Sequence, residues 1–307
     1  MMNLSGSTRL IGIFGDPIAH SLSPAMHNPA FVKYGLDFAY VPLQVKPPDL
    51  EKAVDALRLF NFRGANITLP HKQKILPYLD EVSEISRLMG AVNTVVNEDG
   101  KLFGTTTDAE GFLMGFHEAG HRFLNRTVAI LGNGGSARTL IFALLVNAKL
   151  SENNSTEIIT EADKPARIFL FGRDADKTNK LVAEIKSTLK THGIAFDPQS
   201  LEAKSLDQYS QHKSEIDIVI NATPVGMKPN FSASPLSAQD LVEGQIVYDI
   251  VYTPEQTQLL RDANARGLKT VGGLGMLVHQ GRASFKLWTG ILPEAADYYA
   301  SARKQLL

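Results

Sequence analysis

The chain has 307 residues, of which 44% are hydrophobic and 21% are charged, and its formal net charge is -1. This length is typical of two domains, and the composition is that of a folded globular protein and not of a disordered chain. A nearly neutral chain lacks the excess of lysine and arginine that binds phosphate backbones, so nucleic acid is not an expected partner. Cysteine is absent, which excludes disulfides and thiolate chemistry.

The N-terminal residues contain no apolar segment of signal-peptide length, and the longest apolar runs are far shorter than the ~18 residues that a membrane helix needs. We therefore expect a cytoplasmic protein without membrane contacts, whose partner is a small molecule. The sequence leaves the oligomeric state open between monomer and homodimer.

Strand-like apolar runs alternate with helical patterns along the chain. This alternation predicts an α/β fold with mostly parallel sheets. Proline and glycine punctuation predicts one helix that opens at Ser23-Pro24 and ends by Gly35, and another that opens at Pro254 and ends by Gly267. The polar segment 151–165 is expected to be a surface insertion. The expected strands are 10–14, 38–43, 65–69, 128–131, 168–171, 216–220 and 246–250.

A glycine-rich turn follows the predicted strand at 128–131 and precedes an apolar helix. Its pattern is G-x-G-x-x-A, from Gly132 to Ala137. In Rossmann folds such a turn lets the backbone approach a pyrophosphate, which is bound at the helix N-terminus. The strand before the turn and the helix after it indicate a dinucleotide site.

The end of the next strand, which selects the dinucleotide in this fold, reads Gly172-Arg173-Asp174. Arg173, with Lys177 one turn later, would suit the 2'-phosphate of NADP. Asp174 would suit the ribose hydroxyl of NAD. The pattern favours NADP and leaves NAD open.

Three polar segments, 21–24, 66–72 and 90–94, each follow or adjoin a strand-like run. Pro70 suits the first turn of a helix, which would include Lys72. Ligands of open α/β sheets bind beyond the carboxyl ends of strands, so these polar groups are candidates for one site. A lysine beside an aspartate such as Asp108 can handle the proton that accompanies hydride transfer. Spacing alone also allows a surface lysine and a helix-capping aspartate.

Seven motifs in a fixed order, between about residues 11 and 290, resemble the shikimate dehydrogenase family. This resemblance implies reversible reduction of 3-dehydroshikimate to shikimate by NADPH, on the route to aromatic amino acids. The motifs are Ser-Leu-Ser-Pro (21–24), Asn-Ile-Thr-Leu-Pro-His-Lys (66–72), Gly-Ala-Val-Asn-Thr (90–94), Gly-Asn-Gly-Gly (132–135), Asn-Ala-Thr-Pro-Val-Gly-Met (221–227), Asp-Ile-Val-Tyr-Thr-Pro (249–254) and Gly-Met-Leu-Val-His-Gln (275–280).

The resemblance also implies residue roles. Lys72 and Asp108 would be the catalytic pair. The substrate would be bound by Ser21, Ser23, Asn66, Thr68, Asn93, Tyr252 and Gln280. The cofactor would be bound by Gly132, Asn133, Gly134, Gly135, Ser136, Arg173, Lys177, Thr223, Gly273 and Met276. The family usually has Asn-Arg-Thr where this chain has Gly172-Arg173-Asp174.

We expect two domains. Residues 1–108 and 275–307 would form an α/β substrate-binding and catalytic domain. Residues 109–274 would form an NADP-binding domain, with the doubly wound parallel sheet of the Rossmann type.

Three other interpretations remain. His117-Glu-Ala-Gly-His121 matches the short H-E-x-x-H zinc pattern, but Gly120 should end the helix before His121, so no metal is expected. A regulatory protein could keep the nicotinamide-binding fold without catalysis. A quinate/shikimate dehydrogenase that uses NAD would carry much the same motifs.

Overall fold

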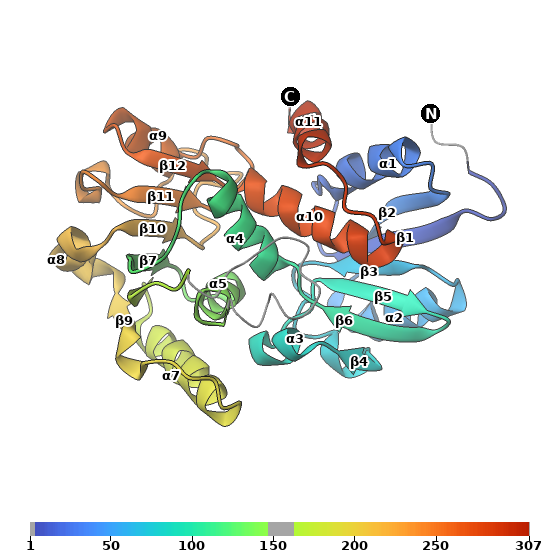
Figure 1. The fold of residues 1–307 in the computed structure, drawn as a ribbon, viewed down its shortest axis with the longest axis horizontal. Coiled ribbons are helices and arrows are strands. Elements are labelled where there is room, and N and C mark those ends of the chain that lie inside the picture. Colours follow the sequence, from blue (N-terminus) through green and yellow to red (C-terminus); the bar gives the residue numbers. More distant parts are fainter. Residues whose placement is uncertain (1–3, 147–162, 307) are drawn as a thin grey trace. The chain divides into compact units, whose positions relative to one another are not determined.

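A computed structural model describes residues 4–146 and 163–306 (Figure 1). The chain divides into two compact units. Unit 1 is Met1–Asp108 with Val278–Leu307, and unit 2 is Ala109–Leu277. Most of the predicted insertion, residues 151–162, lies outside the described residues. Within the described ranges, no helix combines the length and the apolar character needed to cross a membrane.

Unit 1 contains a six-stranded mixed sheet of order β2-β1-β3-β5-β6-β4. β1 pairs in parallel with β2 and β3, whereas β5 is antiparallel to β3 and β6. The carboxyl ends of β1, β2, β3 and β6 therefore share one edge with the start of β5. The strands are β1 (Arg9–Gly15), β2 (Phe38–Gln44), β3 (Gly64–Ile67), β4 (Glu81–Val82), β5 (Thr94–Glu98) and β6 (Lys101–Thr105).

Helices pack around this sheet. Apolar residues of α2, including Val54 and Leu57, join one core cluster with the strands. A second, aromatic cluster surrounds His27 of α1, whose ring stacks on Tyr40 at 4.5 Å between centroids. Burial lowers the pKa of His27 to about 3, so its ring is neutral. The helices are α1 (Ser23–Lys33), η1 (Pro47–Asp49), α2 (Leu50–Leu59), η2 (Leu76–Tyr78), α3 (Glu84–Met89), α10 (Leu274–Thr289), which enters from unit 2, and α11 (Ala295–Leu306).

Unit 2 contains a second six-stranded sheet, of order β12-β11-β10-β7-β8-β9, in which every pairing is parallel. Numbered from its first strand, this is the 3-2-1-4-5-6 order of the Rossmann fold, so the predicted fold class is confirmed. The strands are β7 (Thr127–Leu131), β8 (Arg167–Gly172), β9 (Leu201–Ser205), β10 (Ile218–Asn221), β11 (Ile246–Asp249) and β12 (Lys269–Gly272).

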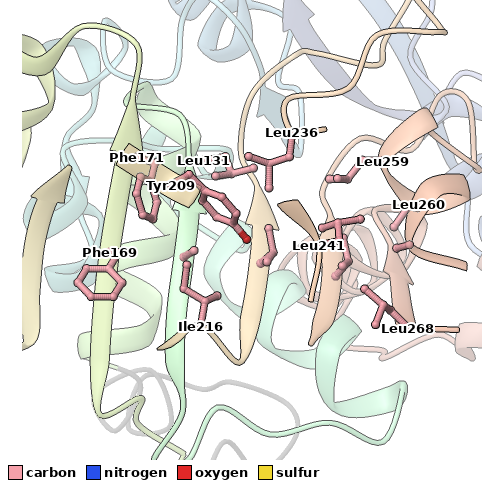
Figure 2. Packing of buried hydrophobic residues seen from close by; sticks show 14 residues of the cluster. Leu131, Phe169, Phe171, Tyr209, Ile216, Leu236, Leu241, Leu259, Leu260 and Leu268 are labelled. Carbon is pink, nitrogen blue, oxygen red and sulfur yellow. The ribbon is translucent and has the colours of Figure 1, made fainter. Parts of the chain in front are cut away.

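Both faces of the central strands in unit 2 are buried. Ala129 and Leu131 of β7 face a cluster that includes Phe171 and Tyr209 (Figure 2), while Val128 and Ile130 between them are equally buried. Coverage on both faces explains why these strands are continuous apolar runs instead of alternating ones. The helices of unit 2 are α4 (Asp108–Glu118), which starts on the last residue of unit 1, α5 (Gly135–Leu145), α7 (Ala175–Thr191), η3 (Pro198–Ser200), η4 (Leu206–Gln208), α8 (Tyr209–His212), η5 (Lys213–Glu215), η6 (Ala238–Asp240) and α9 (Gln258–Ala265).

Two helix starts expected from proline are wrong. Residues 70–75 form consecutive turns instead of a helix, because His71 N-H donates to the Thr68 carbonyl and Ile75 N-H to the His71 carbonyl. Lys72 therefore lies in a turn. The helix expected from Pro254 begins later, at Gln258, since the side chain of Thr257 accepts the capping hydrogen bond from Leu260 N-H.

A buried carboxylate joins the ends of β10 and β11. Asp249 accepts hydrogen bonds from Asn221 Nδ2 at 2.9 Å, Val251 N-H at 3.0 Å and the Thr257 hydroxyl at 2.6 Å. Burial raises the pKa of Asp249 to about 6, although these three donors oppose the shift.

Replacing Gly64 by alanine should destabilise unit 1. A Cβ at Gly64 would lie 2.2 Å from the Val95 carbonyl oxygen and 2.5 Å from Trp288 Nε1, which hydrogen-bond to each other at 3.0 Å. We expect Gly64→Ala to lower the free energy of unfolding by about 1 to 3 kcal/mol. Trp288 is the only tryptophan, so its fluorescence during urea unfolding reports on this unit. Gly6→Ala is the control, because a Cβ there has nothing within 4 Å, and equal midpoints for the two variants would contradict the close packing.

The pH dependence of stability should change when Asp249 is replaced by asparagine. A carboxyl whose pKa rises from 3.8 to about 6 on folding stabilises the protein below pH 3.8, and this contribution is lost as the pH rises through 6. Between pH 4 and pH 7, the unfolding free energy of the wild type should therefore fall relative to Asp249→Asn by roughly 2 to 3 kcal/mol. Urea titrations at several pH values measure this difference. A difference that does not vary with pH would contradict the assignment.

Candidate active site

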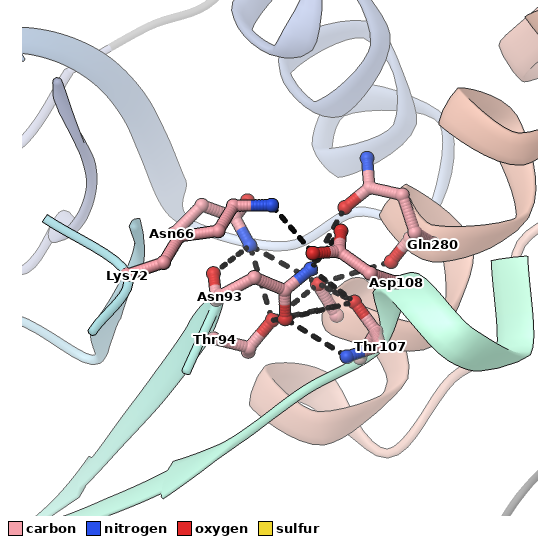
Figure 3. Close-up of polar contacts among 8 residues, drawn as sticks. Asn66, Lys72, Asn93, Thr94, Thr107, Asp108 and Gln280 are labelled. Carbon is pink, nitrogen blue, oxygen red and sulfur yellow. Dashed lines mark hydrogen bonds and ion pairs between the residues drawn. The ribbon is translucent and has the colours of Figure 1, made fainter. Parts of the chain in front are cut away.

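The sheet of unit 1 brings the predicted polar segments to one edge. Asn66 near the end of β3 pairs with Thr94 at the start of β5, and Thr94 pairs with Thr105 at the end of β6. Asn93 directly precedes β5, and Asp108 follows shortly after β6. Figure 3 shows the side chains of Asn66, Asn93, Thr94 and Asp108 pointing toward one another.

Lys72 and Asp108 form an ion pair at this edge. Lys72 Nζ donates to Asp108 Oδ2 at 2.5 Å, and the two side chains are 29% and 12% exposed. The turn that carries Lys72 is fixed to the same edge, because the Lys72 carbonyl accepts from Val92 N-H at 2.8 Å. The pair is therefore held by backbone contacts and remains open to solvent on the lysine side.

Asn93 is the centre of the polar cluster. Its Nδ2 donates to Asp108 Oδ1 at 2.8 Å and to the Thr107 hydroxyl at 2.9 Å, and it lies 3.4 Å from Gln280 Oε1. Its Oδ1 accepts from Thr107 N-H at 2.8 Å and lies 2.8 Å from the Thr94 hydroxyl. Asn93 thus joins the segment before β5 to the start of α4.

Asn66 and Ser23 belong to the same network through Tyr40. The Tyr40 hydroxyl donates to Asn66 Oδ1 at 2.6 Å. Burial raises the pKa of Tyr40, and a hydrogen bond with Ser23 opposes this shift. Ser23 does not cap α1, because the cap position is Leu22 and it has no capping side-chain bond.

The remaining predicted substrate residues are less closely joined. Ser21 precedes α1, and its hydroxyl accepts from Ser23 N-H at 3.3 Å. Thr68 is half-buried after β3 and packs against Gly15. Gln280 lies on α10 and reaches the cluster through Asn93, as Figure 3 shows. Tyr252 lies in unit 2 after β11, and burial raises its pKa.

Four residues of the network were not predicted as site residues: Tyr40, Thr94, Thr107 and Ser284. Thr94 and Thr107 adjoin the predicted Asn93 and Asp108 in sequence, which was a usable signal. Ser284 lies one helical turn after Gln280 on α10, and this i, i+4 spacing puts both on one face of the helix.

The glycine-rich turn is shaped as predicted around the start of α5. Gly132 has φ +111°, and a Cβ there would lie 2.8 Å from Thr223 Cγ2. Gly134 and Gly135 border open space, since a Cβ on either would meet nothing within 4 Å. With exposed Ser136, they leave the first N-H groups of α5 accessible, and such groups bind anions. These residues fit a dinucleotide pyrophosphate.

The turn after β8 lies beside the glycine-rich turn. Asn133 Nδ2 donates to the Thr178 hydroxyl at 3.0 Å and to the Asp174 carbonyl at 3.3 Å. Asp174 caps α7 by accepting from Lys177 N-H at 3.0 Å, so α7 starts at Ala175. Arg173 and Lys177 are exposed. Asn133 thus links the expected pyrophosphate site to the residues expected to select the dinucleotide.

The other predicted cofactor residues follow strands of the same parallel sheet. Thr223 follows β10, and its hydroxyl donates to Asn221 Oδ1 at 2.6 Å. Gly273 follows β12, where a Cβ would lie 2.2 Å from the Ile250 carbonyl oxygen. Met276 lies near the start of α10, and its backbone is close to Gly115. All of them lie at or beyond the carboxyl edge of the sheet, where ligands of this fold bind.

The H-E-x-x-H segment is divided by the end of a helix. α4 ends at Glu118, Gly120 has φ +80°, and His121 lies beyond it. His117 instead binds the carboxylate of Asp163. Among the described residues, no group of three or more histidine, aspartate or glutamate side chains is arranged to hold a metal ion.

Two family models match the chain, one before unit 2 in the sequence and one that begins near the end of unit 2. The shikimate dehydrogenase substrate binding domain matches residues 13–95, and the shikimate 5'-dehydrogenase C-terminal domain matches residues 273–302. The first match contains most of the polar segments described above, and the second contains Met276, Gln280 and Ser284.

Relatives that align over nearly the whole chain are also shikimate dehydrogenases by name. The shikimate dehydrogenase (NADP(+)) of Halothermothrix orenii is 38% identical over 94% of this chain and 93% of its own length. A crystal structure of a shikimate dehydrogenase in complex with NADP+ superposes with a TM-score of 0.88 and 34% identity, covering 99% of this chain and 98% of that one. The Listeria monocytogenes shikimate 5-dehydrogenase, in complex with shikimate and NAD, has a TM-score of 0.81 and 36% identity, covering 97% of each chain. These similarities confirm the resemblance of the seven motifs, and the chain belongs to the shikimate dehydrogenase family.

Proposed function

We propose that this chain is an NADP-dependent shikimate dehydrogenase, which reversibly reduces 3-dehydroshikimate to shikimate. The observation that carries the proposal is the Lys72-Asp108 ion pair within a cluster of amides and hydroxyls, in a chain whose relatives of nearly equal length are named shikimate dehydrogenases. The cluster offers donors and acceptors suited to a small polyhydroxylated ring. Because NADPH is an intracellular cofactor, the proposal includes a cytoplasmic location.

The residues of the cluster have distinct proposed roles. Lys72 Nζ donates a proton to the carbonyl oxygen of the substrate as the oxygen gains negative charge. Both oxygens of Asp108 already accept hydrogen bonds, one from Asn93 and one from Lys72. We therefore propose that Asp108 orients Lys72 and that Lys72 alone acts as the acid and the base.

Substrate binding is assigned to the polar residues around this pair. Hydroxyls at the start of α1 would bind the substrate carboxylate, where the helix dipole also favours an anion. Amides and hydroxyls at the edge of the sheet would bind the ring hydroxyls, and Tyr252 is a further proposed substrate residue. The proposed substrate residues are Ser21, Ser23, Asn66, Thr68, Asn93, Gln280 and Tyr252.

Bound NADPH supplies the hydride. Gly132, Asn133, Gly134, Gly135 and Ser136 would hold its pyrophosphate at the start of α5. Outside that turn, Arg173 and Lys177 would bind the 2'-phosphate, and Thr223, Gly273 and Met276 would hold the nicotinamide end. Residues 109–274 are accordingly the proposed NADP-binding domain, and residues 1–108 with 275–307 the substrate-binding and catalytic domain.

Lys72→Ala should abolish most of the activity. Loss of the proton donor should lower kcat by roughly a hundredfold to ten-thousandfold, the usual contribution of general acid-base catalysis. Nicotinamide absorbance measures turnover of shikimate and of quinate, each with NADP and with NAD, and shikimate with NADP should be preferred. Lys74→Ala is the control, since Lys74 is exposed in the same turn.

These assays test the dehydrogenase activity, the choice of substrate and cofactor, and the role of Lys72 separately. No turnover of either substrate by the wild type would reject the dehydrogenase and favour a regulatory protein. A preference for quinate with NAD would favour the related quinate/shikimate dehydrogenase. Full activity of Lys72→Ala would reject the role of the lysine alone.

Arg173→Ala should weaken the use of NADP selectively. Removing a charged hydrogen bond to the 2'-phosphate should lower kcat/KM for NADP roughly tenfold to a hundredfold and leave that for NAD nearly unchanged. Asp174→Asn should raise the NADP to NAD ratio a few-fold, because asparagine keeps the cap of α7 but removes a negative charge. Lys190→Ala, at the other end of α7, is the control. Equal losses with NADP and NAD in Arg173→Ala would exclude a contact with the 2'-phosphate.

A further inference from the structure

Ser284 of α10 is the junction of the polar network, although it is fully buried. Its hydroxyl oxygen lies 3.1 Å from Asn66 Nδ2, 2.8 Å from the Thr94 hydroxyl and 3.1 Å from the Thr107 hydroxyl. It also lies 3.0 Å from the Gln280 carbonyl oxygen, one turn earlier on the same helix. One side chain thus connects α10 to β3, to β5 and to the segment before α4.

The directions of these hydrogen bonds follow from the chemistry of the partners. A hydroxyl has one hydrogen to donate and two lone pairs to accept with. The Gln280 carbonyl can only accept and Asn66 Nδ2 can only donate, so Ser284 donates to the first and accepts from the second. Its other lone pair accepts from one threonine hydroxyl, either Thr94 or Thr107.

The remaining threonine hydroxyl then has a defined partner. It donates to Asn93 Oδ1, which lies 2.8 Å from the Thr94 hydroxyl and 3.2 Å from the Thr107 hydroxyl. The second lone pair of Asn93 Oδ1 is already taken by Thr107 N-H. Without Ser284, the two threonine hydroxyls would share Asn93 Oδ1 and their own 3.4 Å contact, and Asn66 Nδ2 would keep the Asn93 carbonyl and the Thr94 hydroxyl as acceptors.

We infer that Ser284 is a positioning residue, which holds the Thr94 and Thr107 hydroxyls beside the Asn93 amide and so supports the bond from Asn93 to Asp108 beside Lys72. This inference rests on the proposed dehydrogenase function. Ser284 acts through other side chains and is assigned no contact with the substrate. A catalytic group displaced by about 1 Å loses roughly a hundredfold in rate, so a buried positioning residue has a large effect on turnover.

The test is Ser284→Ala, compared with Ser86→Ala as a matched control. Ser86 is also a fully buried serine of unit 1, but its hydroxyl has no hydrogen-bond partner among the described residues. We expect kcat/KM for shikimate with NADP to fall roughly tenfold to a hundredfold in Ser284→Ala and to stay within about twofold of the wild type in Ser86→Ala. Trp288 fluorescence verifies that both variants are folded.

A double-mutant cycle distinguishes positioning from a general structural role. In an Asn93→Ala background, Ser284→Ala should change kcat/KM by less than about twofold, because the side chain through which it acts is gone. A loss as large in that background as in the wild type would overturn the inference. Activity of Ser284→Ala equal to that of Ser86→Ala would overturn it as well.

A second variant keeps the inference testable if Ser284→Ala does not fold. Ser284→Cys keeps nearly the same volume and a weak donor, so its kcat/KM should lie clearly below that of the wild type. Full activity of a folded Ser284→Cys would count against the inference. Absence of activity in the wild type would instead reject the proposed function, so the two failures are distinguishable.

Discussion

The orientation of the Asn93 side-chain amide is the constraint on which the candidate site depends. Thr107 N-H can only donate and the Asp108 carboxylate can only accept, so the amide cannot reverse without losing both bonds. The partners of the Asn93 amide lie on β5, on the segment that follows β6 and on α10. Correct placement of Asp108, and therefore of Lys72, requires the sheet and α10 to be assembled. In a buried network of this kind every unsatisfied group is costly, which favours a single arrangement.

A comparable constraint operates at the carboxyl edge of the sheet in unit 2. The Asn133 amide binds the Asp174 carbonyl and the Thr178 hydroxyl, and both bonds pass close to Gly172. A Cβ at Gly172 would lie 2.7 Å from Asn133 Nδ2 and 2.1 Å from the Thr178 hydroxyl oxygen. Glycine leaves room for Asn133, and Asp174 caps α7 while Arg173 stays exposed.

Local patterns predicted much of the fold. Each apolar run expected to be a strand lies within one or two residues of an observed strand, because most of these strands are largely buried and leave a clear local signal. Prolines were less informative, since Pro70 lies in a turn and Pro254 lies in a bend ahead of Thr257, which caps α9. β5 and β6 were also missed. Their polar residues, such as Asn97, are satisfied by partners distant in the sequence, which a local reading cannot detect.

The α/β class, the glycine-rich turn, the family and the residue types of the site could be predicted from the sequence, because these depend on local periodicity and on ordered motifs. Which polar residues meet depends on the folded structure. The antiparallel β5 brings Asn93 to the edge where β3 and β6 end, and α10 adds Ser284 from nearly two hundred residues later. Such contacts depend on strand register and helix packing, and these are set by the whole folded chain. Lys72 and Asp108 are separated by 36 positions in sequence, and this assembly alone makes them an ion pair.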